Sequence, residues 1–405
     1  MTETPLAGAP SLSIPEVDAL LTALEGGGAE TRFVGGVVRD SLIGRQDADI
    51  DLATTLTPDM VTNRLENAGI KTAPTGLAHG TVTAIVNHRG FEITTLRRDV
   101  STDGRHADVA YTDDWKEDAA RRDFTINAMS ADRAGRVYDY FDGMKDLKAG
   151  RVRFVGAADR RVAEDYLRIL RFFRFSAWYG AGEIDGDGLE ACRVGVPGLR
   201  RVSAERIRHE LLRLLAAPNP GQALGAMTAT GVLKALIGAA PASADAVLAI
   251  EQAAGRQPDP LLRLAALAPD AGAALPTRLR LSRSESAALA AMAPPWTDLG
   301  ATPAAWRAAL HRRGREAFER RALLAASVGE ETLLTDRLRA ASDWRSRTMP
   351  VKGKDLIRLG LTPGPEVGAM MRKLEAAWIE GDFEADREAL LAEAAALMAA
   401  GKNGT

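Results

Sequence analysis

The 405-residue chain contains a single cysteine, Cys192, and five scattered histidines. One thiol cannot form an intrachain disulfide or a cysteine-based zinc cluster, and the histidines lack metal-ligand spacing. No stretch approaches the roughly 18 consecutive apolar residues of a membrane-spanning helix, and the sequence starts without the basic and apolar pattern of a secretory signal. We therefore expect no membrane association and a reducing, cytoplasmic location.

Lysine and aromatic residues are also scarce. Lysine supplies nine of the 52 basic residues, and aromatic residues make up 5% of the chain. The hydrophobic content of 46% and charged content of 26% are typical of a globular protein and exclude a mainly disordered or collagen-like chain. The net charge of −2 shows no overall excess of positive charge, but local clusters of arginine still allow nucleic-acid binding.

The character of the chain changes near residue 145. Before that point, short β-rich runs alternate with turns, and after residue 158 the pattern is helical nearly throughout. The predicted strands are 31–34, 48–53, 81–87, 90–96 and 136–141, and the predicted early helices are about 14–25, 36–43 and 57–68. The fold class predicted is α+β, a head with a mixed sheet and helices followed by an all-helical remainder.

Residues 97–121 form a polar segment with several charges and little periodicity. The segment shows neither the alternation of a half-buried strand nor the repeat of an amphipathic helix, so we expect a loop. Loops of this length inside a compact domain are usually functional or disordered.

Two adjacent glycines, Gly35 and Gly36, lie where the first predicted strand gives way to a helix. Glycines at such a turn let the backbone approach a ligand closely, and the free N–H groups of a helix start favour anions. Arg39, one turn inside the helix, can add a charged donor to a phosphate. A glycine pair before a helix is on its own a common structural turn.

Asp49 and Asp51 flank Ile50 in the predicted strand at 48–53. Alternate side chains share one face of a strand, so we expect the two carboxylates to project together. Carboxylates this close repel each other unless a cation lies between them, and Mg²⁺ takes oxygen ligands while keeping positions for phosphates. Glu92 is a third carboxylate, either a direct ligand or a group behind the ligands.

An Asp-x-Asp strand on its own is also typical of a solvated face. Here the glycine turn, Arg39 and the carboxylate pair follow one another, with ten residues from Arg39 to Asp49. The combination in this order indicates a site for a metal-bound triphosphate.

This stretch resembles the first motif of the class II tRNA nucleotidyltransferase and bacterial poly(A) polymerase family, which belongs to the DNA polymerase β-like nucleotidyltransferases. The matching stretches are GGVVRD at 35–40 with DID at 49–51, RRDFTINAM at 121–129, DYFDG at 139–143 with DL at 146–147, and EDYLRILRFFRF at 164–175. The resemblance is strong over about 31–215 and less specific over the tail at 350–365.

The last of these stretches lies in a helix predicted at 160–179. Its polar stripe consists of Glu164, Arg168 and Arg171, with Asp165 and Arg174 at the two shoulders. An Asp three residues before an Arg is normally a surface pair of small energetic weight. However, cytosine and adenine both present an amino donor beside a ring-nitrogen acceptor, and uracil and guanine reverse that order. One carboxylate and one guanidinium can therefore accept CTP and ATP and reject UTP and GTP.

The resemblance implies nucleotide contacts by Asp165, Arg168, Arg171 and Arg174, and contact of Arg122 with the triphosphate. It implies that Gly35, Gly36 and Arg39 steady the phosphates. We expect Asn127 to be a structural hydrogen-bond partner within the second motif.

The activity implied by the resemblance is addition of CCA to the 3′ end of tRNA from CTP and ATP, with release of pyrophosphate. Asp49 and Asp51 would bind two Mg²⁺ ions about 3.5–4 Å apart, with Glu92 as a further catalytic carboxylate. One ion would activate the RNA 3′-hydroxyl, and the other would orient the triphosphate and stabilise the leaving group. The partners are tRNA, CTP and ATP, and no obligate protein partner is evident.

The implied domains are a catalytic head at 1–145, a helical neck at 146–235 that carries the base-recognition helix, and a tRNA-binding body and tail at 236–405. Three arginine-rich stretches, at 199–213, 306–321 and 344–358, can contact RNA phosphates. Each can equally be an ordinary solvated helix surface.

Other activities stay open. Within the family these are poly(A) synthesis and partial addition of CC or of A. The polar segment at 97–121 resembles the flexible loop associated with switching to A, which favours full CCA addition. The chain has no His-Asp dipeptide, so the phosphohydrolase module of some relatives is not expected. Outside the family, the alternatives are an adenylyltransferase for a small molecule and a non-catalytic RNA-binding protein.

Overall fold

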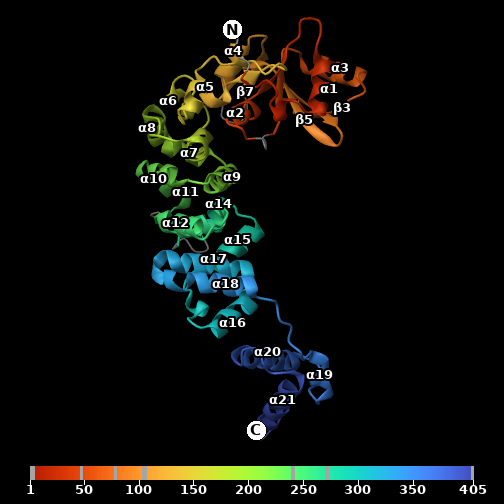
Figure 1. Cartoon of the computed structure of the whole chain (residues 1–405), viewed down its shortest axis with the longest axis vertical. Coiled ribbons are helices and arrows are strands. Elements are labelled where there is room, and N and C mark those ends of the chain that lie inside the picture. The colour runs from red at the N-terminus through yellow and green to blue at the C-terminus, as the bar shows by residue number, and fades with distance from the viewer. Residues whose placement is uncertain are drawn as a thin grey trace. The chain divides into compact units, whose positions relative to one another are not determined.

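The structure of the chain is a computed structural model, drawn in Figure 1. It describes residues 5–45, 49–76, 80–102, 107–238, 242–269 and 274–402. The chain divides into two compact units, Met1–Pro241 with Arg278–Arg280, and Ala242–Thr277 with Leu281–Thr405. The predicted α+β class is confirmed, because the described strands all lie in the first unit and the described part of the second is helical.

Seven strands of the first unit form one mixed sheet in the order β3-β4-β5-β2-β1-β8-β9. Their bounds are β1 Thr31–Val34, β2 Asp51–Thr54, β3 Lys71–Gly76, β4 Thr81–Val86, β5 Arg89–Thr95, β8 Ser130–Ala131 and β9 Val137–Tyr138. β2 and β5 run parallel with Asp51 opposite Glu92, and the other neighbours are antiparallel. Two of the predicted catalytic carboxylates therefore lie side by side on adjacent strands.

Several strand predictions need correction. The strand predicted at 136–141 is shorter, since β9 covers only Val137–Tyr138, and β8 was not predicted. The strand predicted at 48–53 begins only at Asp51, so Asp49 precedes it, and residue 48 lies outside the described residues. Strand β3 was not predicted, because its sequence Lys-Thr-Ala-Pro-Thr-Gly is typical of a turn. Pro74 is tolerated there because β3 is an edge strand, which leaves one side of its backbone unpaired.

The prediction of a loop at 97–121 was wrong. β6 (Arg97–Thr102) and β7 (Ala107–Tyr111) form a separate two-stranded antiparallel sheet, and α4 (Trp115–Ala120) follows. Residues 103–106 lie outside the described residues. Main-chain hydrogen bonds hold a two-stranded ribbon without the alternating pattern of a strand packed on a core, which is why periodicity did not reveal it.

The remaining helices of the first unit include the three predicted early ones, α1, α2 and α3. Their bounds are η1 Pro10–Leu12, α1 Pro15–Leu24, α2 Gly36–Leu42, α3 Pro58–Asn67, η3 Thr125–Asn127, α5 Gly143–Lys148, α6 Ala158–Glu164, α7 Leu167–Tyr179, α8 Gly186–Gly195, η4 Val196–Arg201, α9 Ala204–Leu215, α10 Gly221–Ala229 and α11 Val232–Ile237. Figure 1 shows α6 to α11 following the head along the chain.

The helix predicted at 160–179 is in fact two helices, α6 and α7. Asp165 lies between them with an extended backbone (φ −149°, ψ 108°), and its Oδ1 accepts the N–H of Leu167 at 3.0 Å. An aspartate that binds a nearby backbone N–H competes with helix continuation. An amphipathic pattern does not reveal this competition, and the prediction of one continuous helix was wrong for that reason.

An aromatic cluster joins α7 to the segment of the second motif. The Phe124 ring lies 4.8 Å from Phe154 and 5.2 Å from Phe175, and Phe154 stacks on Phe172 at 5.4 Å, measured between ring centroids. Phe124, Phe154 and Phe172 are fully buried. Burial of large aromatic side chains makes this contact a major source of stability, and it fixes α7 relative to the head.

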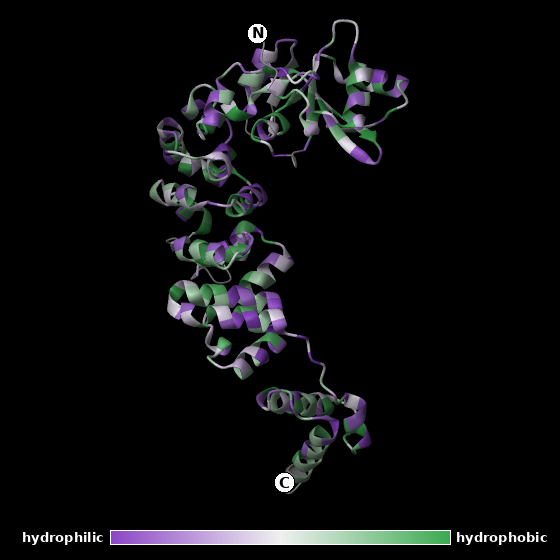
Figure 2. Cartoon of the chain, in the orientation of Figure 1, coloured by the Kyte–Doolittle hydropathy of each residue, from purple (hydrophilic) through white to green (hydrophobic). Residues whose placement is uncertain are grey.

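The second unit is an array of helices with two hydrophobic clusters. The bounds are α12 Asp245–Ala253, α13 Pro260–Leu267, α14 Ala274–Leu279, α15 Arg283–Met292, η5 Thr297–Leu299, α16 Pro303–Arg313, α17 Arg315–Ala325, η6 Ala326–Glu330, η7 Glu331–Leu333, α18 Leu334–Asp343, α19 Gly353–Arg358, α20 Pro365–Glu380 and α21 Arg387–Lys402. One cluster centres on Trp306 and Phe318, the other on Trp378 and Phe383. Figure 2 shows hydrophobic and hydrophilic residues on the same helices, as expected for helices that bury one face. None of the described helices combines the length and apolarity needed to cross a bilayer.

A buried carboxylate joins two of the family-like motifs in the first unit. Asp146, whose side chain is 0% exposed, accepts hydrogen bonds from Thr125 Oγ1 at 2.7 Å, from Arg151 Nη2 at 2.7 Å and from Arg153 Nε at 3.0 Å.

We expect Asp146→Ala to lower the free energy of unfolding by about 2–4 kcal/mol, because it leaves these donors without their acceptor. Urea denaturation measures this. The control is Asp159→Ala on α6, an exposed position where the change should stay within about 0.5 kcal/mol. Equal losses in both variants would contradict the prediction.

Candidate active site

A cleft of about 1310 Å³ lies in the first unit. Its walls come from the β1–α2 turn, the start of β2, the segment after α4, and the helices α7 and α9. The charged residues that line it are Arg39, Asp40, Arg45, Asp49, Asp51, Arg97, Arg121, Arg122, Asp123, Asp165, Arg168, Arg171, Arg174, Arg206 and Arg213. Ten guanidinium groups against five carboxylates favour a polyanionic ligand such as a triphosphate.

The glycine turn forms one edge of this cleft. Gly35 has φ +68° and ψ −120°, a backbone conformation that glycine adopts at little cost. A Cβ added to it would lie 3.2 Å from Nη1 of Arg122, and α2 begins at the next residue, Gly36. The turn therefore brings main chain and one guanidinium close together, as a phosphate site requires.

Asp49 and Asp51 both line the cleft, as predicted from their spacing, although only Asp51 belongs to β2. Asp49 is exposed and Asp51 is half-buried. Glu92 is exposed beside Asp51, opposite it in the parallel pair β2–β5, and is not one of the lining residues. Glu92 is thus placed to act on Asp51 through its charge.

The Asp51 carboxyl has a perturbed acidity. Burial raises its pKa to about 6, the charges of Glu92 and Asp49 add to this, and the charge of Arg122 opposes it. A carboxyl in such surroundings gains from a bound cation, which relieves both the burial and the repulsion. Among the described residues no set of three or more His, Cys, Asp or Glu converges on one point. Two carboxylates suit a divalent cation that takes its other oxygen ligands from water and phosphate.

Arg122 is held by a buried carboxylate. Asp118, with a side chain 3% exposed, accepts from Arg122 Nη2 at 3.1 Å and from Arg121 Nε at 2.8 Å. Burial by itself raises the pKa of Asp118, but the charges of Arg122 and Arg121 and their hydrogen bonds outweigh it and lower the pKa. Arg122 is therefore fixed with Nη1 toward Gly35.

Arg39 lines the cleft but is engaged within the protein. Its Nε and Nη2 each donate to Asp40 at 2.9 Å, and its Nη1 donates to Asn127 at 2.5 Å. Its guanidinium lies over the Tyr179 ring at 4.2 Å, and Tyr179 donates to Asp40 at 2.9 Å. The role of Arg39 in this structure is to tie α2 to α7, while Asn127 is a structural hydrogen-bond partner as expected.

The two residues predicted to recognise the base both face the cleft and are held by different partners. Asp165 Oδ2 accepts from Nη2 of Arg206 at 2.7 Å. Arg168 donates from Nη1 to the main-chain oxygen of Arg161 at 2.8 Å and pairs with Glu164. The side chains of Asp165 and Arg168 therefore have separate partners, each with capacity left for a ligand.

Arg171 and Arg174 lie further along α7 against two buried acids. Arg171 Nε donates to Asp123 at 2.6 Å, and Arg174 Nε donates to Glu210 at 2.6 Å. Burial by itself raises the pKa of Asp123, but Arg171 and hydrogen bonds from Asn127 and the Phe124 N–H lower it below its usual value. Arg174 is 9% exposed, so it contributes charge to the cleft more than donors.

Several residues of this network were not predicted, among them Tyr179, Arg161, Asp118 and Glu210. Arg161 donates through Nη2 to the main-chain oxygens of Arg121 and Arg122, the latter at 2.6 Å. Asp118 and Glu210 are the acids described above. The spacing of Asp118 to the two arginines, three and four residues, was the available signal. No local pattern connects Arg161 or Glu210 to residues 36 or more positions away.

The arginine-rich stretches differ from one another. In 306–321, Trp306 is buried and Arg321 is 2% exposed, with its donors on the carbonyl oxygens of residues 291, 293 and 295. The prediction of a phosphate-contacting surface was wrong for these two, because both are part of the helical core. In 344–358, Arg345, Arg347, Lys352, Lys354 and Arg358 are exposed. In 199–213, Arg206 and Arg213 line the cleft.

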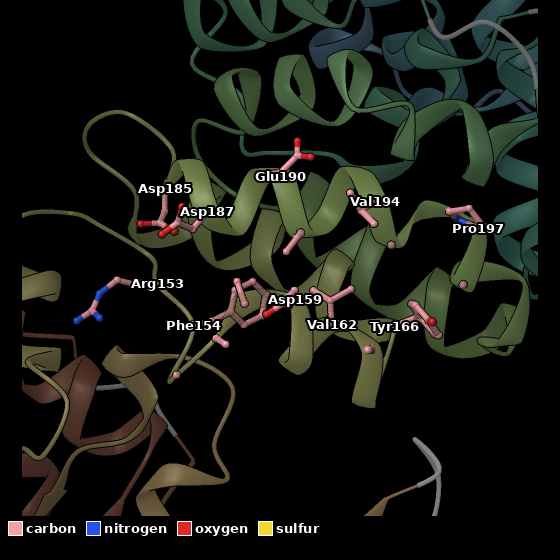
Figure 3. Close-up of a pocket in the computed structure, with 17 residues that line it drawn as sticks. Arg153, Phe154, Asp159, Val162, Tyr166, Asp185, Asp187, Glu190, Val194 and Pro197 are labelled. Carbon is pink, nitrogen blue, oxygen red and sulfur yellow. The ribbon is translucent and has the colours of Figure 1, made fainter.

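A second cavity, of about 600 Å³, lies between α6 and α8 (Figure 3). Asp185, Asp187 and Arg153 lie at one end, and Val194 and Pro197 lie toward the other. Arg153 is already bound to Asp146. With acidic and apolar walls and its cation engaged, this cavity does not suit a triphosphate, which leaves the larger cleft as the candidate site.

The chain is similar to known proteins in both sequence and fold. Residues 31–153 match the family model described as the poly A polymerase head domain, and residues 183–243 match a model described as a probable RNA and SrmB-binding site of polymerase A. The chain is 37% identical over 389 residues to the mitochondrial CCA tRNA nucleotidyltransferase 1 of Danio rerio, covering 89% of this chain and 86% of that protein. It is 31% identical over 394 residues to the CCA-adding enzyme of Levilactobacillus brevis, covering 92% and 95%.

The fold is also similar to solved structures. The structure of the Bacillus stearothermophilus CCA-adding enzyme in complex with CTP matches with a TM-score of 0.78 and 26% identity. The match covers 98% of this chain and 100% of that one.

The raised pKa of Asp51 predicts a pH-dependent stability without divalent cations. Because the folded state holds the proton up to about pH 6 and the unfolded state loses it near the ordinary value of 3.8, the free energy of unfolding falls as pH rises through this window. Asp51→Asn has no titrating carboxyl at this position, so its free energy of unfolding should not fall in this pH window. We expect its Tm to exceed that of the parent protein at pH 7.5 by about 2–4 °C and the difference to shrink toward pH 4.5.

Thermal unfolding in chelator at several pH values measures this. Glu92→Gln and Asp49→Asn are matched variants, and we expect the gain at pH 7.5 to be larger for Glu92→Gln, because Glu92 raises the pKa of Asp51 more than Asp49 does. A Tm difference that does not change with pH would contradict the prediction.

Proposed function

The chain belongs to the family of class II CCA-adding enzymes and bacterial poly(A) polymerases, and from this premise we propose that it adds CCA to the 3′ end of tRNA, without a template, from CTP and ATP. The observation that carries the proposal is one cleft that contains the carboxylates Asp49 and Asp51, the guanidinium of Arg122 beside Gly35, and the base-recognition residue Asp165. Nucleotidyl transfer needs metal binding, phosphate contacts and base recognition at one place.

We propose Mg²⁺ as the metal, held by Asp49 and Asp51. When bound, the ions supply activation of the RNA 3′-hydroxyl and neutralisation of charge on the triphosphate and the leaving pyrophosphate. Glu92, beside Asp51, raises the negative potential at the metal site. A pair of carboxylates leaves positions on the metal for phosphate oxygens, which suits a metal that arrives with the nucleotide.

The chain's own residues position the nucleotide. Arg122, fixed by Asp118, donates toward the phosphates at the Gly35 turn, and Arg121 and Arg171 add positive charge. The main chain at Gly35 and Gly36 permits close approach, and Arg39 keeps the turn in place through Asp40. Holding the reacting groups in line lowers the barrier because no positional freedom is lost in the reaction step.

Base selection falls to Asp165 and Arg168. The Asp165 carboxylate accepts the exocyclic amino group of cytosine or adenine, and the Arg168 guanidinium donates to the adjacent ring nitrogen. Uracil and guanine present a carbonyl oxygen to the carboxylate and an N–H to the guanidinium, so both contacts become repulsive.

Among the alternatives, full CCA addition is favoured over poly(A) synthesis and over partial addition. The curated relatives over most of the chain are named for CCA addition. The segment at 97–121, which resembles the loop associated with switching to A, is also present and contains β6, β7 and α4. A small-molecule adenylyltransferase has no use for a second, helical unit with exposed basic residues, and a non-catalytic RNA-binding protein has no use for the Asp49–Asp51 pair.

A free, buried Cys192 fits a reducing compartment, and a cytoplasmic location is part of the proposal.

We propose the domain functions in the order head at 1–145, neck at 146–235, and body and tail at 236–405. Head and neck belong to one compact unit, and the cleft is built from both. For RNA binding we assign the exposed stretch at 344–358, whose lysines and arginines suit contacts with RNA phosphates.

Incorporation of labelled nucleotides tests the activity. On tRNA that ends before CCA, we expect two additions with CTP alone, no addition with ATP alone, and a stop after one A with both. On tRNA that ends in CC, we expect one A. Long products with ATP alone would establish poly(A) synthesis instead, and transfer to small acceptors without tRNA would establish the small-molecule activity.

Asp51→Ala should lower the rate of incorporation by about three orders of magnitude, because it removes a metal-binding carboxylate at the reacting phosphate. Asp59→Ala, an exposed aspartate in the first turn of α3, is the matched control with unchanged rate. Full incorporation by Asp51→Ala would remove the catalytic assignment.

The tail assignment has its own test. Replacing Arg345, Arg347 and Lys354 together by Ala should weaken tRNA binding and reduce the slope of log K against log salt by about 0.9 for each phosphate that the protein no longer neutralises. The control removes the same charge from exposed positions on α18 and α20, Arg339, Arg372 and Lys373. Filter binding at several salt concentrations measures both, and an equal change in slope would contradict the assignment.

A further inference from the structure

The break between α6 and α7 gives Asp165 a second task. Besides facing the cleft, its Oδ1 accepts the N–H of Leu167 at 3.0 Å, and its main-chain oxygen accepts the N–H of Arg168 at 3.0 Å. The carboxylate that is proposed to meet the base thus also binds the N–H of the first residue of α7. One contact of this kind limits the position of the carboxylate but does not stop its rotation about the Cβ–Cγ bond.

The second oxygen is held from a different helix. Nη2 of Arg206, in the first half of α9, donates to Asp165 Oδ2 at 2.7 Å across 41 positions of the chain. The Arg206 side chain is 36% exposed and that of Asp165 is 22% exposed, and both line the cleft. A pair this exposed contributes little to stability. Its effect lies in geometry, because two donors on two different oxygens fix the plane of the carboxylate.

The fixed plane leaves defined acceptor positions. An ionised carboxylate has about four lone-pair positions and no donor. Leu167 and Arg206 use one on each oxygen, so the remaining ones point in directions set by these two donors. An exocyclic amino group can occupy such a position, whereas the carbonyl oxygen of uracil or guanine meets only lone pairs and is repelled.

We propose that Arg206 is a specificity-determining residue for nucleotide selection, acting as a positioning residue through Asp165. This inference rests on the proposed function. Without Arg206 the carboxylate is free to turn, and a turned carboxylate no longer presents its acceptors only to an amino group, so the wrong bases are admitted. Loss of Arg206 should therefore reduce discrimination between bases. Loss of positive charge in the cleft would instead weaken the binding of all four nucleoside triphosphates to the same extent.

Single-turnover kcat/KM for each of the four nucleotides tests this. On tRNA that ends before CCA, Arg206→Ala should lower the ratio of CTP to UTP on the order of tenfold, and on tRNA that ends in CC it should lower the ratio of ATP to GTP by a similar factor. Arg206→Lys keeps a charged donor and should recover part of the ratio. Arg206→Gln, which keeps most of the side-chain length, serves as a second variant if Arg206→Ala does not fold.

The matched control is Arg193→Ala, an exposed arginine on α8 that pairs with Glu190 and does not line the cleft. Its nucleotide ratios should equal those of the parent protein. A double-mutant cycle with Asp165→Ala adds a readout that a merely structural role would not move, because Arg206 should have no further effect on the ratio once Asp165 is absent.

Unchanged ratios in Arg206→Ala, with all four nucleotides slowed equally or not at all, would overturn the inference. Equal changes in the ratio for Arg193→Ala would do the same. Failure of the proposed function is distinct from both, since in that case the parent protein itself would not add C and A to tRNA.

Discussion

Mutual repulsion among ten guanidinium groups is the constraint on which the candidate site depends. The structure meets it with carboxylates that hold the arginines in fixed positions: Asp40 for Arg39, Asp118 for Arg121 and Arg122, Asp123 for Arg171, Asp165 for Arg206, Glu164 for Arg168, and Glu210 for Arg174. Several of these acids are buried, and hydrogen bonds from the guanidinium groups offset the cost of burying them. The donors are therefore in place before a nucleotide arrives.

The same network explains how head and neck act as one body. Arg39, Asp40 and Tyr179 tie the glycine turn to α7, and Arg161 ties α6 to the segment that contains Arg122. The proposed phosphate contacts and base contacts are consequently linked by hydrogen bonds and by the buried phenylalanine cluster. Gly198 packs directly against the Tyr166 ring at the start of α7, where a Cβ would lie 2.1 Å from the ring.

Much of this arrangement was predictable from the sequence, and the remainder was not for physical reasons. The spacing of Asp49 and Asp51 predicted that they project together, the family resemblance implied a nucleotide contact for Asp165, and all three line one cleft. The α+β class followed from the change of pattern near residue 145. The helix break at Asp165 was not predictable from periodicity, because a side chain bonding its neighbour's backbone leaves no periodic trace. Pairs such as Arg206 with Asp165 join residues far apart in the chain, and a single sequence carries no record of them.

The scarcity of lysine has a consequence at the cleft. Among the described residues that line it, every cation is an arginine, and the guanidinium group keeps its charge at any pH a cell reaches. Acetylation, which neutralises lysine, leaves these side chains unchanged. Electrostatic attraction for nucleoside triphosphates is therefore a permanent property of this surface, and acetyl-transfer signalling has no target among the cations described there.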